Sequence, residues 1–298
     1  MVFNKRNIAA FFLSKYYILS GKVKKVLGRA SDGDFILSVY FHDPTKKLFE
    51  SCVKWFIKNG YSFISIEELA AVAKGEKPFP LAAVILTVDD GWSGNRENIA
   101  AVANHYEIPV TIFASTQPIA TGDAFWWSYI AEANKKGLVS QSVHALKKVP
   151  NDERVKVVNV VKPQLPLQRE ALTIEELKEI SNTAFVSIGS HTVTHPILTN
   201  CSDEQSIFEI RESRKILEEW LHKDVAHFAY PNGEFTRREI SFLKDSGYKI
   251  AFTTQPRYIT SDNFTDLYTL PRFDVLEDVS FAENICRMTG VWFNKKSI

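Results

Sequence analysis

The sequence predicts an α/β protein whose mostly parallel sheet closes, or nearly closes, into a barrel. Short apolar stretches that fit buried strands alternate with segments of helical periodicity along most of the chain, which is the order expected of βαβ units. A chain of 298 residues can bury a large core, either as one barrel or as two smaller domains. Polar residues directly follow several of the predicted strands, and in a parallel barrel those strand ends meet on one face.

The predicted strands are rich in aliphatic and aromatic residues and are bounded by polar or turn-forming ones. In chain order they span residues 36–41, 63–64, 84–88, 110–114, 185–189, 226–230, 250–253 and 267–270.

Helix-start and helix-stop signals separate these strands. Asp43 and Pro44 fit the cap and the first turn of a helix that Asn59-Gly60 would end. Capping boxes, in which Ser or Thr precedes Glu or Gln by three residues, predict helix starts at Ser65, Thr173 and Ser202. Further helices are expected at about 96–106, 129–137, 236–246 and 278–289.

The chain divides into an N-terminal arm, residues 1–31, and a single catalytic barrel, residues 32–298. Between about residues 117 and 170 the alternation of strands and helices lapses. We interpret that stretch as an insertion on the barrel rim rather than as a domain.

The arm contains seven Lys or Arg residues and no acid. It also carries apolar residues at helical spacing, namely Ile8, Phe11, Phe12, Tyr16 and Leu19. We favour a helix packed on the body of the protein. The alternative is a basic amphipathic helix in peripheral contact with an anionic membrane.

Composition excludes some partners and compartments. The formal net charge is +1, so no global field favours nucleic acid, and no nucleic-acid partner is expected. The arm does not resemble a signal peptide, and no apolar run is long enough for a transmembrane helix. The three cysteines are widely spaced and fit ordinary thiols of a reducing compartment. We therefore expect a cytoplasmic protein, with membrane association as the alternative.

A candidate metal site follows from two strand ends. The strand over 84–88 stops on Asp89 and Asp90, and neighbouring carboxylates repel unless a cation neutralises one of them. After the strand over 185–189, His191 and His195 stand four residues apart and can meet one ion. Two imidazoles and one carboxylate leave an open position, as a catalytic zinc site needs, and the second carboxylate is free to act as a base.

Three other polar residues also lie at or just beyond predicted strand ends: His42, Tyr230 and Arg272. Each signal is weak alone, because Asp-Asp-Gly is usually a turn and His-x-x-x-His recurs by chance on helices. Five separate segments that deliver polar groups to one face of a barrel make a stronger case than any single motif.

These motifs resemble those of the polysaccharide deacetylases, carbohydrate esterase family four. The first family motif resembles Thr87–Gly91, the second resembles His191–His195, and the third resembles Phe228–Gly233. Tyr40-Phe41-His42 resembles the opening of members that carry the catalytic histidine near the N-terminus. The likeness covers about residues 36–275.

The resemblance implies a distorted, incomplete (β/α) barrel with fewer than eight repeats, together with a divalent metal, most often Zn²⁺. It implies these roles: Asp89 as general base, Asp90, His191 and His195 as metal ligands, His42 as general acid, and Tyr230, Pro231 and Asn232 as the motif that binds substrate and the oxyanion. Ala229 stands where many members have an arginine that orients the base, and Arg272 is the candidate to supply that guanidinium.

The resemblance also implies removal of N-acetyl groups from an amino-sugar glycan, a glycan precursor or a sugar-lipid. A candidate acid at His42 favours an amide substrate, because an amine leaves poorly unless it is protonated. Trp126 and Trp127 offer apolar faces to a sugar ring, with packing in the rim as an equal alternative. Three other functions stay open: an O-acetyl esterase or other amidohydrolase on this scaffold, an Fe(II) oxygenase, and a non-catalytic glycan-binding protein.

Overall fold

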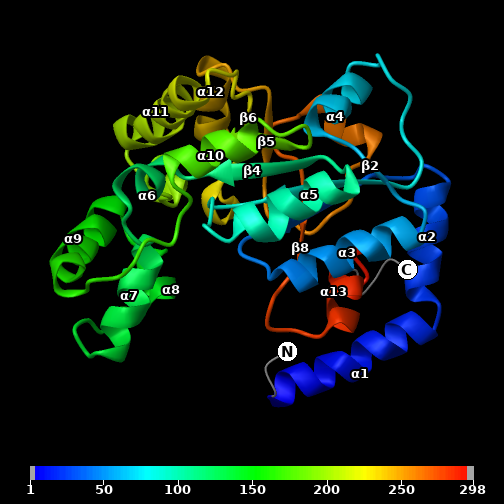
Figure 1. Cartoon of the computed structure of the whole chain (residues 1–298), viewed down its shortest axis with the longest axis horizontal. Helices are drawn as coiled ribbons and strands as arrows, with labels where there is room; N and C mark the ends of the chain where they lie inside the picture. The colour runs from blue at the N-terminus through cyan, green and yellow to red at the C-terminus, as the bar shows by residue number, and fades with distance from the viewer. Residues whose placement is uncertain (1–3, 294–298) are drawn as a thin grey trace.

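A single parallel sheet organises the computed structural model, which describes residues 4–293 (Figure 1). Its strands follow the order β7-β6-β5-β4-β3-β1-β8, and β2 pairs with β3. The strands are β1 (Leu37–Phe41), β2 (Ser62–Phe63), β3 (Ala83–Val88), β4 (Val110–Ala114), β5 (Val186–Ser190), β6 (His227–Ala229), β7 (Ile250–Phe252) and β8 (Phe273–Asp274). Within the described residues β7 and β8 share no ladder, and a single parallel bridge from Phe252 to Leu270 borders the gap. The fold is therefore an incomplete, distorted barrel, as predicted.

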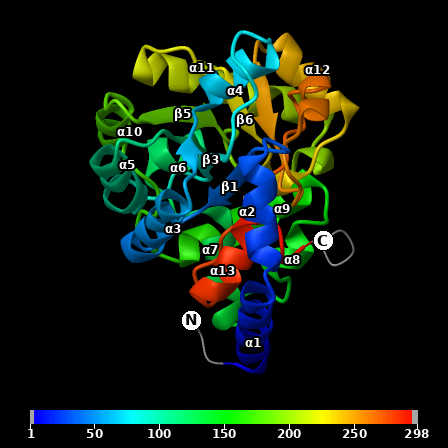
Figure 2. The ribbon, with the colours of Figure 1, turned by 90° about the vertical axis from the view of Figure 1, so that its right-hand side faces the viewer.

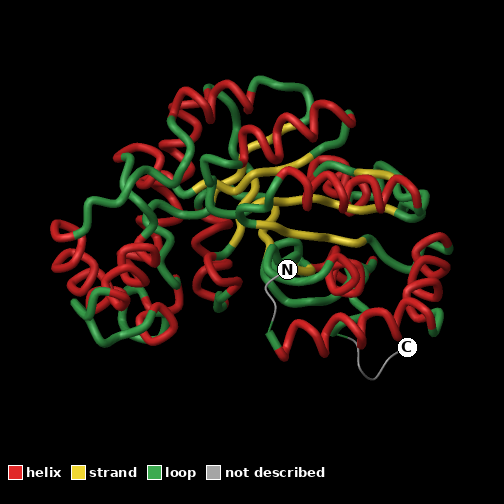
Figure 3. Tube along the Cα trace, turned by 60° about the horizontal axis from the view of Figure 1, so that its bottom comes forward, coloured by secondary structure: helices red, strands yellow, loops and turns green. Residues whose placement is uncertain are grey.

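Helices cover the outside of the strands (Figure 3). The helices are α1 (Lys5–Leu19), α2 (Lys22–Ser31), α3 (Lys46–Lys58), α4 (Ile66–Ala73), η1 (Arg96–Ala100), α5 (Ala101–Tyr106), α6 (Thr116–Thr121), α7 (Trp126–Lys135), α8 (Val143–Leu146), α9 (Asn151–Val161), η2 (Lys162–Gln164), α10 (Ile174–Ser181), η3 (Leu198–Asn200), α11 (Asp203–Leu221), η4 (Pro231–Gly233), α12 (Arg237–Asp245), η5 (Ser261–Thr265) and α13 (Phe281–Met288). The predicted capping boxes at Ser65, Thr173 and Ser202 are all formed.

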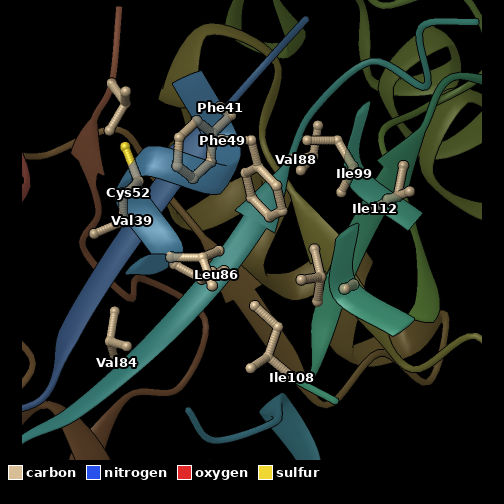
Figure 4. Close-up of a cluster of buried hydrophobic side chains, with 14 of the residues drawn as sticks. Val39, Phe41, Phe49, Cys52, Val84, Leu86, Val88, Ile99, Ile108 and Ile112 are labelled. Atoms are coloured by element: carbon tan, nitrogen blue, oxygen red, sulfur yellow. The ribbon is translucent and has the colours of Figure 1, made fainter. Parts of the chain in front are cut away.

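The core has two layers because side chains alternate along each strand. Val84, Leu86 and Val88 of β3 face the outer helices and pack with residues of β1 and α3 (Figure 4). Ile85 belongs instead to the cluster inside the barrel. Each fully buried aliphatic side chain contributes about 1.5–3 kcal/mol, so the strands, and the polar residues at their ends, are firmly held. By the same alternation, Asp89 continues the inward-facing row.

One predicted helix cap and one predicted strand are wrong. Helix α3 starts after Thr45, whose hydroxyl accepts a hydrogen bond from the Leu48 amide at 3.3 Å, so Asp43 is not the cap. The stretch 267–270 is not a strand: Asp266 accepts a hydrogen bond from the Tyr268 amide at 3.1 Å, which bends the chain there. The final strand is β8, which begins just beyond that bend.

The N-terminal arm forms two helices that meet at a corner (Figures 1 and 2). Val23, Val26 and Ala30 of α2 join the main core. Helix α1 packs on α13 and lies at the outer edge of the molecule. Within residues 4–293, no helix combines the length and the apolar character needed to cross a membrane.

The predicted insertion contains α6 to α9, which extend from one side of the barrel (Figure 1). Its helices share their own apolar cluster, which includes Tyr129, Ile130, Leu146 and Val161. Trp127 packs both against that cluster and against the main core. These helices therefore form one wall beside the carboxyl ends of the strands, where Trp127 and Val143 line the cavity described below.

Candidate active site

Most of the predicted site residues line one cavity of about 420 Å³ at the carboxyl ends of the strands. They are His42, Asp89, Asp90, Trp127, His191, His195 and Asn232. A second cavity, about 510 Å³, lies around the amino ends of β5, β6 and β7 and contains none of these groups. The smaller cavity is the candidate site, because only there do buried acids and imidazoles converge.

Asp90, His191 and His195 form a buried cluster whose ligand atoms all lie within 4.8 Å of one another. Asp90 Oδ1 is 3.5 Å from His191 Nε2 and 3.3 Å from His195 Nε2. Among the described residues, this buried oxygen accepts no hydrogen bond. A buried carboxylate oxygen is costly without a partner, and a cation between it and the two imidazoles would satisfy it. The donor set therefore fits a divalent metal such as Zn²⁺.

Hydrogen bonds behind the cluster orient two of its ligands. His191 Nδ1 donates to the Ala229 carbonyl at 2.7 Å, which leaves Nε2 with its lone pair toward Asp90. Trp92 Nε1 donates to Asp90 Oδ2 at 2.9 Å, so the other carboxylate oxygen is left for the cluster. Trp92 directly follows the Asp-Asp-Gly motif, but no sequence signal marked its role.

The cluster rests on backbone that non-glycine residues seldom adopt. Asp90, Thr192 and His195 have φ of 77°, 70° and 52°, and such left-handed conformations persist only where the surroundings hold them. Buried Glu209 holds the loop between Thr192 and His195, since its carboxylate accepts hydrogen bonds from the Val193 and Thr194 amides, both at 2.8 Å. Glu209, on α11, was also missed, because nothing in its local sequence distinguishes it from a surface glutamate.

Protonation in the cluster follows from burial and from the shared carboxylate. Burial acts to raise the pKa of Asp90, but the two imidazoles outweigh it and hold that pKa well below its usual range. Burial acts to lower the pKa of His191, yet Asp90 and Asp89 leave it raised. For His195 burial dominates, and the pKa falls to about 4. His195 is therefore a neutral imidazole, able to bind a metal, at ordinary pH.

Asp89 and Arg272 form a buried, bidentate ion pair. Arg272 Nη1 donates to Asp89 Oδ1 at 2.7 Å, and Nη2 donates to Oδ2 at 2.8 Å. The same guanidinium also donates to the Thr87 hydroxyl at 2.9 Å and to the Thr253 carbonyl at 2.9 Å. Burial acts to raise the pKa of Asp89, but Arg272, together with His191 and His42, outweighs it, so the net shift is downward. Asp89 is thus ionised and fixed in orientation.

His42 stands at the mouth of the same cavity. Its backbone carbonyl accepts a hydrogen bond from Asn95 Nδ2 at 3.1 Å, and its ring lies 5.5 Å from that of Tyr40, edge to face. Its side chain is exposed. The structure thus brings His42 into the cavity that holds Asp89 and Asp90, as the sequence predicted.

The side chains of Tyr230 and Trp126, two of the predicted substrate contacts, lie outside the cavity, and for Trp126 this fits the alternative of packing in the rim. The Tyr230 side chain is fully buried in an apolar cluster with Phe228 and donates to the Tyr268 carbonyl at 3.1 Å. Trp126 is also buried, and its Nε1 donates to the His195 carbonyl at 3.0 Å. Both side chains support the site from behind and do not line it.

The residues next to Trp126 and Tyr230 in the sequence line the cavity or border it. The Trp127 ring lies 4.7 Å from the His195 ring and forms one wall. In the third motif the Tyr230 amide already donates to the Phe252 carbonyl, and Pro231 has no N–H. The Asn232 amide is therefore the candidate hydrogen-bond donor to the oxyanion. Lys147, which no sequence signal marked, also lines the cavity and donates to Asn232 Oδ1 at 3.0 Å.

The family model described as polysaccharide deacetylase matches residues 76–251, more than half of the chain. His42 and Arg272 lie outside the matched residues.

Two curated relatives are 23% identical to this chain. YxkH of Bacillus subtilis, named as a candidate polysaccharide deacetylase, matches over 235 residues, which is 79% of this chain and 66% of the relative. The poly-β-1,6-N-acetyl-D-glucosamine N-deacetylase of Escherichia coli K12 matches over 256 residues, 77% of this chain and 33% of that protein. The chain therefore spans just under two thirds of one relative and about one third of the other.

A solved structure shares the fold. The Streptococcus pyogenes deacetylase PplD, solved with acetate, superposes with a TM-score of 0.60 at 19% identity, covering 85% of this chain and 96% of PplD.

Proposed function

This chain belongs to the polysaccharide deacetylase family, and on that premise we propose that it is a metal-dependent hydrolase that removes N-acetyl groups from an amino-sugar-containing glycan or glycan precursor. One observation carries the proposal. A carboxylate fixed by Arg272 stands beside the cluster of Asp90, His191 and His195, in a cavity that His42 also lines. A base, a cation site and an acid are thus within reach of one small substrate group.

Asp90, His191 and His195 would hold the cation, and a mixed nitrogen and oxygen donor set with an open position favours Zn²⁺. Bound there, a divalent cation supplies Lewis-acid activation of water and of an acyl carbonyl. The chain's own part is to aim Asp90 and His191 at one point, through Trp92 and the Ala229 carbonyl.

Asp89 acts as the general base. It accepts a proton from the water that attacks the acetyl carbonyl, and Arg272 holds both of its oxygens in place for that transfer. A guanidinium on a base lowers its proton affinity, but it also secures the ionised state and the orientation. The Asn232 amide is the candidate donor to the tetrahedral oxyanion, where one well-placed donor contributes about 2.7–4 kcal/mol.

His42 acts as the general acid. The carbon–nitrogen bond breaks as the amine nitrogen receives a proton, and an exposed imidazole at the cavity mouth can deliver it and recover it from solvent. An ester oxygen leaves more readily than an amine, so an O-acetyl glycan esterase needs this acid less. The placement of His42 therefore favours the amide over the ester.

The substrate proposed is an acetylated glycan. The name of the Escherichia coli relative specifies poly-β-1,6-N-acetyl-D-glucosamine, and PplD was solved with acetate. In this chain Trp127 offers an apolar ring face at the cavity wall, which suits the face of a sugar. A polymer and a lipid-linked precursor both present such a unit.

Acetate release tests the proposal. The purified chain is assayed on N-acetylglucosamine oligomers with β-1,6 and with β-1,4 links and on an O-acetylated sugar, with and without a chelator. We expect release from an N-acetyl substrate that the chelator stops and Zn²⁺ restores. Release from the O-acetylated sugar alone would support the esterase, and oligomer binding without release would support a non-catalytic role.

A further inference from the structure

Most of the large apolar side chains of helix α1 lie on the outside, whereas Tyr17 and Ile18 pack against the main core. Five of the twelve exposed large apolar side chains among the described residues lie on this helix, and Phe12 and Leu19 are 66% and 83% exposed. The other three are Ile8, Leu13 and Tyr16. The side that meets the body instead buries Asn7, Ala10 and Ser14. This arrangement reverses the usual one, in which a surface helix buries its apolar stripe.

Polar contacts fix α1 in that rotation. Arg6 forms an ion pair with buried Glu283 of α13 at 2.6 Å, and Asn7 Nδ2 donates to the Asp278 carbonyl at 2.9 Å. Cys286 Sγ lies 3.7 Å from the Ser14 carbonyl. Rolling the helix to bury Phe12 would break these contacts, so the apolar face stays outward.

Uncompensated positive charge accompanies this face. Residues 4–31 contain no acid. Among the described residues, none of the ion pairs involves Lys5, Lys15, Lys22, Lys24 or Lys25. At 3.6 residues per turn, Lys5 and Lys15 fall within or beside the stripe that contains Ile8, Phe12 and Leu19. The outward surface of α1 therefore combines exposed apolar side chains with Lys5 and Lys15, and Lys22, Lys24 and Lys25 follow at the start of α2.

We propose that α1 is a docking surface for an anionic lipid bilayer. An interfacial helix needs an apolar face to enter the headgroup region and basic residues to attract anionic lipid, and α1 with the start of α2 offers both. Figures 1 and 2 place α1 at the outer edge of the fold, where a flat surface can reach it. A second copy fits less well, because a two-fold contact sets the same patch against itself, and these lysines would meet lysines with no acid between them.

Vesicle sedimentation tests this proposal with the whole chain. Vesicles of phosphatidylcholine alone are compared with vesicles that include about one third phosphatidylglycerol, at low and at high salt. We expect at least tenfold stronger partitioning onto the anionic vesicles. High salt should weaken this partitioning, because it screens the attraction between the lysines and the anionic lipid. The double substitution Phe12→Glu with Leu19→Glu should remove most of the binding.

Phe208→Glu is the matched control, since Phe208 on α11 is also exposed (55%) but lies outside this surface. It should bind vesicles as the unaltered chain does, and circular dichroism should show all variants folded. Equal binding by the α1 variant and the control would overturn the proposal. So would a self-association in sedimentation velocity that Phe12→Glu abolishes, with no binding to vesicles. The assay needs no turnover, so its outcome is independent of the proposed deacetylase activity.

Discussion

Arg272 reaches Asp89 from beneath, through the interior of the barrel. The register pairs Phe273 with Val39 in β1, whereas Val88, just before Asp89, pairs with Phe41. The Arg272 backbone therefore lies well below the carboxylate that its side chain holds. The guanidinium carbon lies 4.5 Å from the centre of the Tyr40 ring, so the arginine fills the barrel beneath the active site.

Arg272→Lys tests this relationship. Lysine keeps a charge but cannot make the bidentate contact, so the pKa of Asp89 should rise toward its usual range. A base must be ionised to act, and the acid limb of the pH–rate profile should therefore move to higher pH. Removing one partner of a buried pair costs about 3–5 kcal/mol, and the replacement lysine should reduce that loss. Thermal unfolding should record the remainder as a lower Tm.

The ion pair between Asp89 and Arg272 should also make the stability of the protein depend on pH. Since the pKa of Asp89 is lowered in the fold, the pair stabilises the protein above about pH 4, the unfolded value, and the benefit is lost as pH falls through the folded pKa. The Tm difference between the unaltered chain and Arg272→Lys should shrink at low pH. A constant difference from pH 7 to pH 3 would contradict the assignment.

Metal binding should weaken in acid. A protonated imidazole cannot bind a metal, and the pKa of His191 is raised whereas that of His195 is about 4. His191 should therefore take up a proton first, and Zn²⁺ affinity should fall by about tenfold per pH unit once His191 is protonated. Calorimetric titration of metal-free protein at pH 5.5, 6.5 and 8 measures this, with His191→Ala as the variant that binds no ion. Affinity independent of pH would exclude His191 as a ligand.

Trp92→Phe isolates the indole that orients Asp90. The ring volume is largely kept while the 2.9 Å hydrogen bond to Oδ2 is lost. Loss of such an outer partner typically weakens metal affinity by about 10–100-fold. Trp220→Phe is the control, because Trp220 packs against the main core away from the cluster. If both variants held Zn²⁺ as tightly as the unaltered chain, Trp92 would have only a packing role.

His42→Gln tests whether His42 protonates the amine that leaves from an N-acetyl substrate. Without its acid, N-acetyl hydrolysis should slow by about 10²–10⁴-fold, and any activity on an O-acetyl substrate should fall far less. His105→Gln, an exposed histidine beside Tyr106, should change neither rate. Equal losses on both substrates would mean that His42 does not protonate the leaving group.

The positions of the cluster residues could be predicted because each follows a buried strand. Asp89 and Asp90 follow the largely apolar strand β3, and His191 directly follows β5, a shorter buried strand that ends in Gly189 and Ser190. The alternation within β6 also carries information about Tyr230. Phe228 and Tyr230 share the outward face and Ala229 faces inward, so the period of two predicts a buried tyrosine there.

Most of the supporting contacts could not be predicted, because they depend on register and side-chain reach. Arg272 was predicted to hold Asp89 and to follow a strand, but it precedes β8, and the β1–β8 pairing is what places it under Asp89. Glu209 and Lys147 come from helices whose approach to the site is set by packing of the whole fold. Local sequence patterns do not predict contacts between residues that are far apart in the sequence.

Acetate release by Asp89→Asn, measured beside the unaltered chain with equal bound Zn²⁺, tests whether Asp89 is the general base. Asparagine keeps the shape of the side chain but cannot take a proton from water. We expect a rate on an N-acetyl glycan that is lower by about 10²–10⁴-fold, with one ion still bound per chain. An unchanged rate at full metal content would show that Asp89 is not the base and would overturn the proposed mechanism.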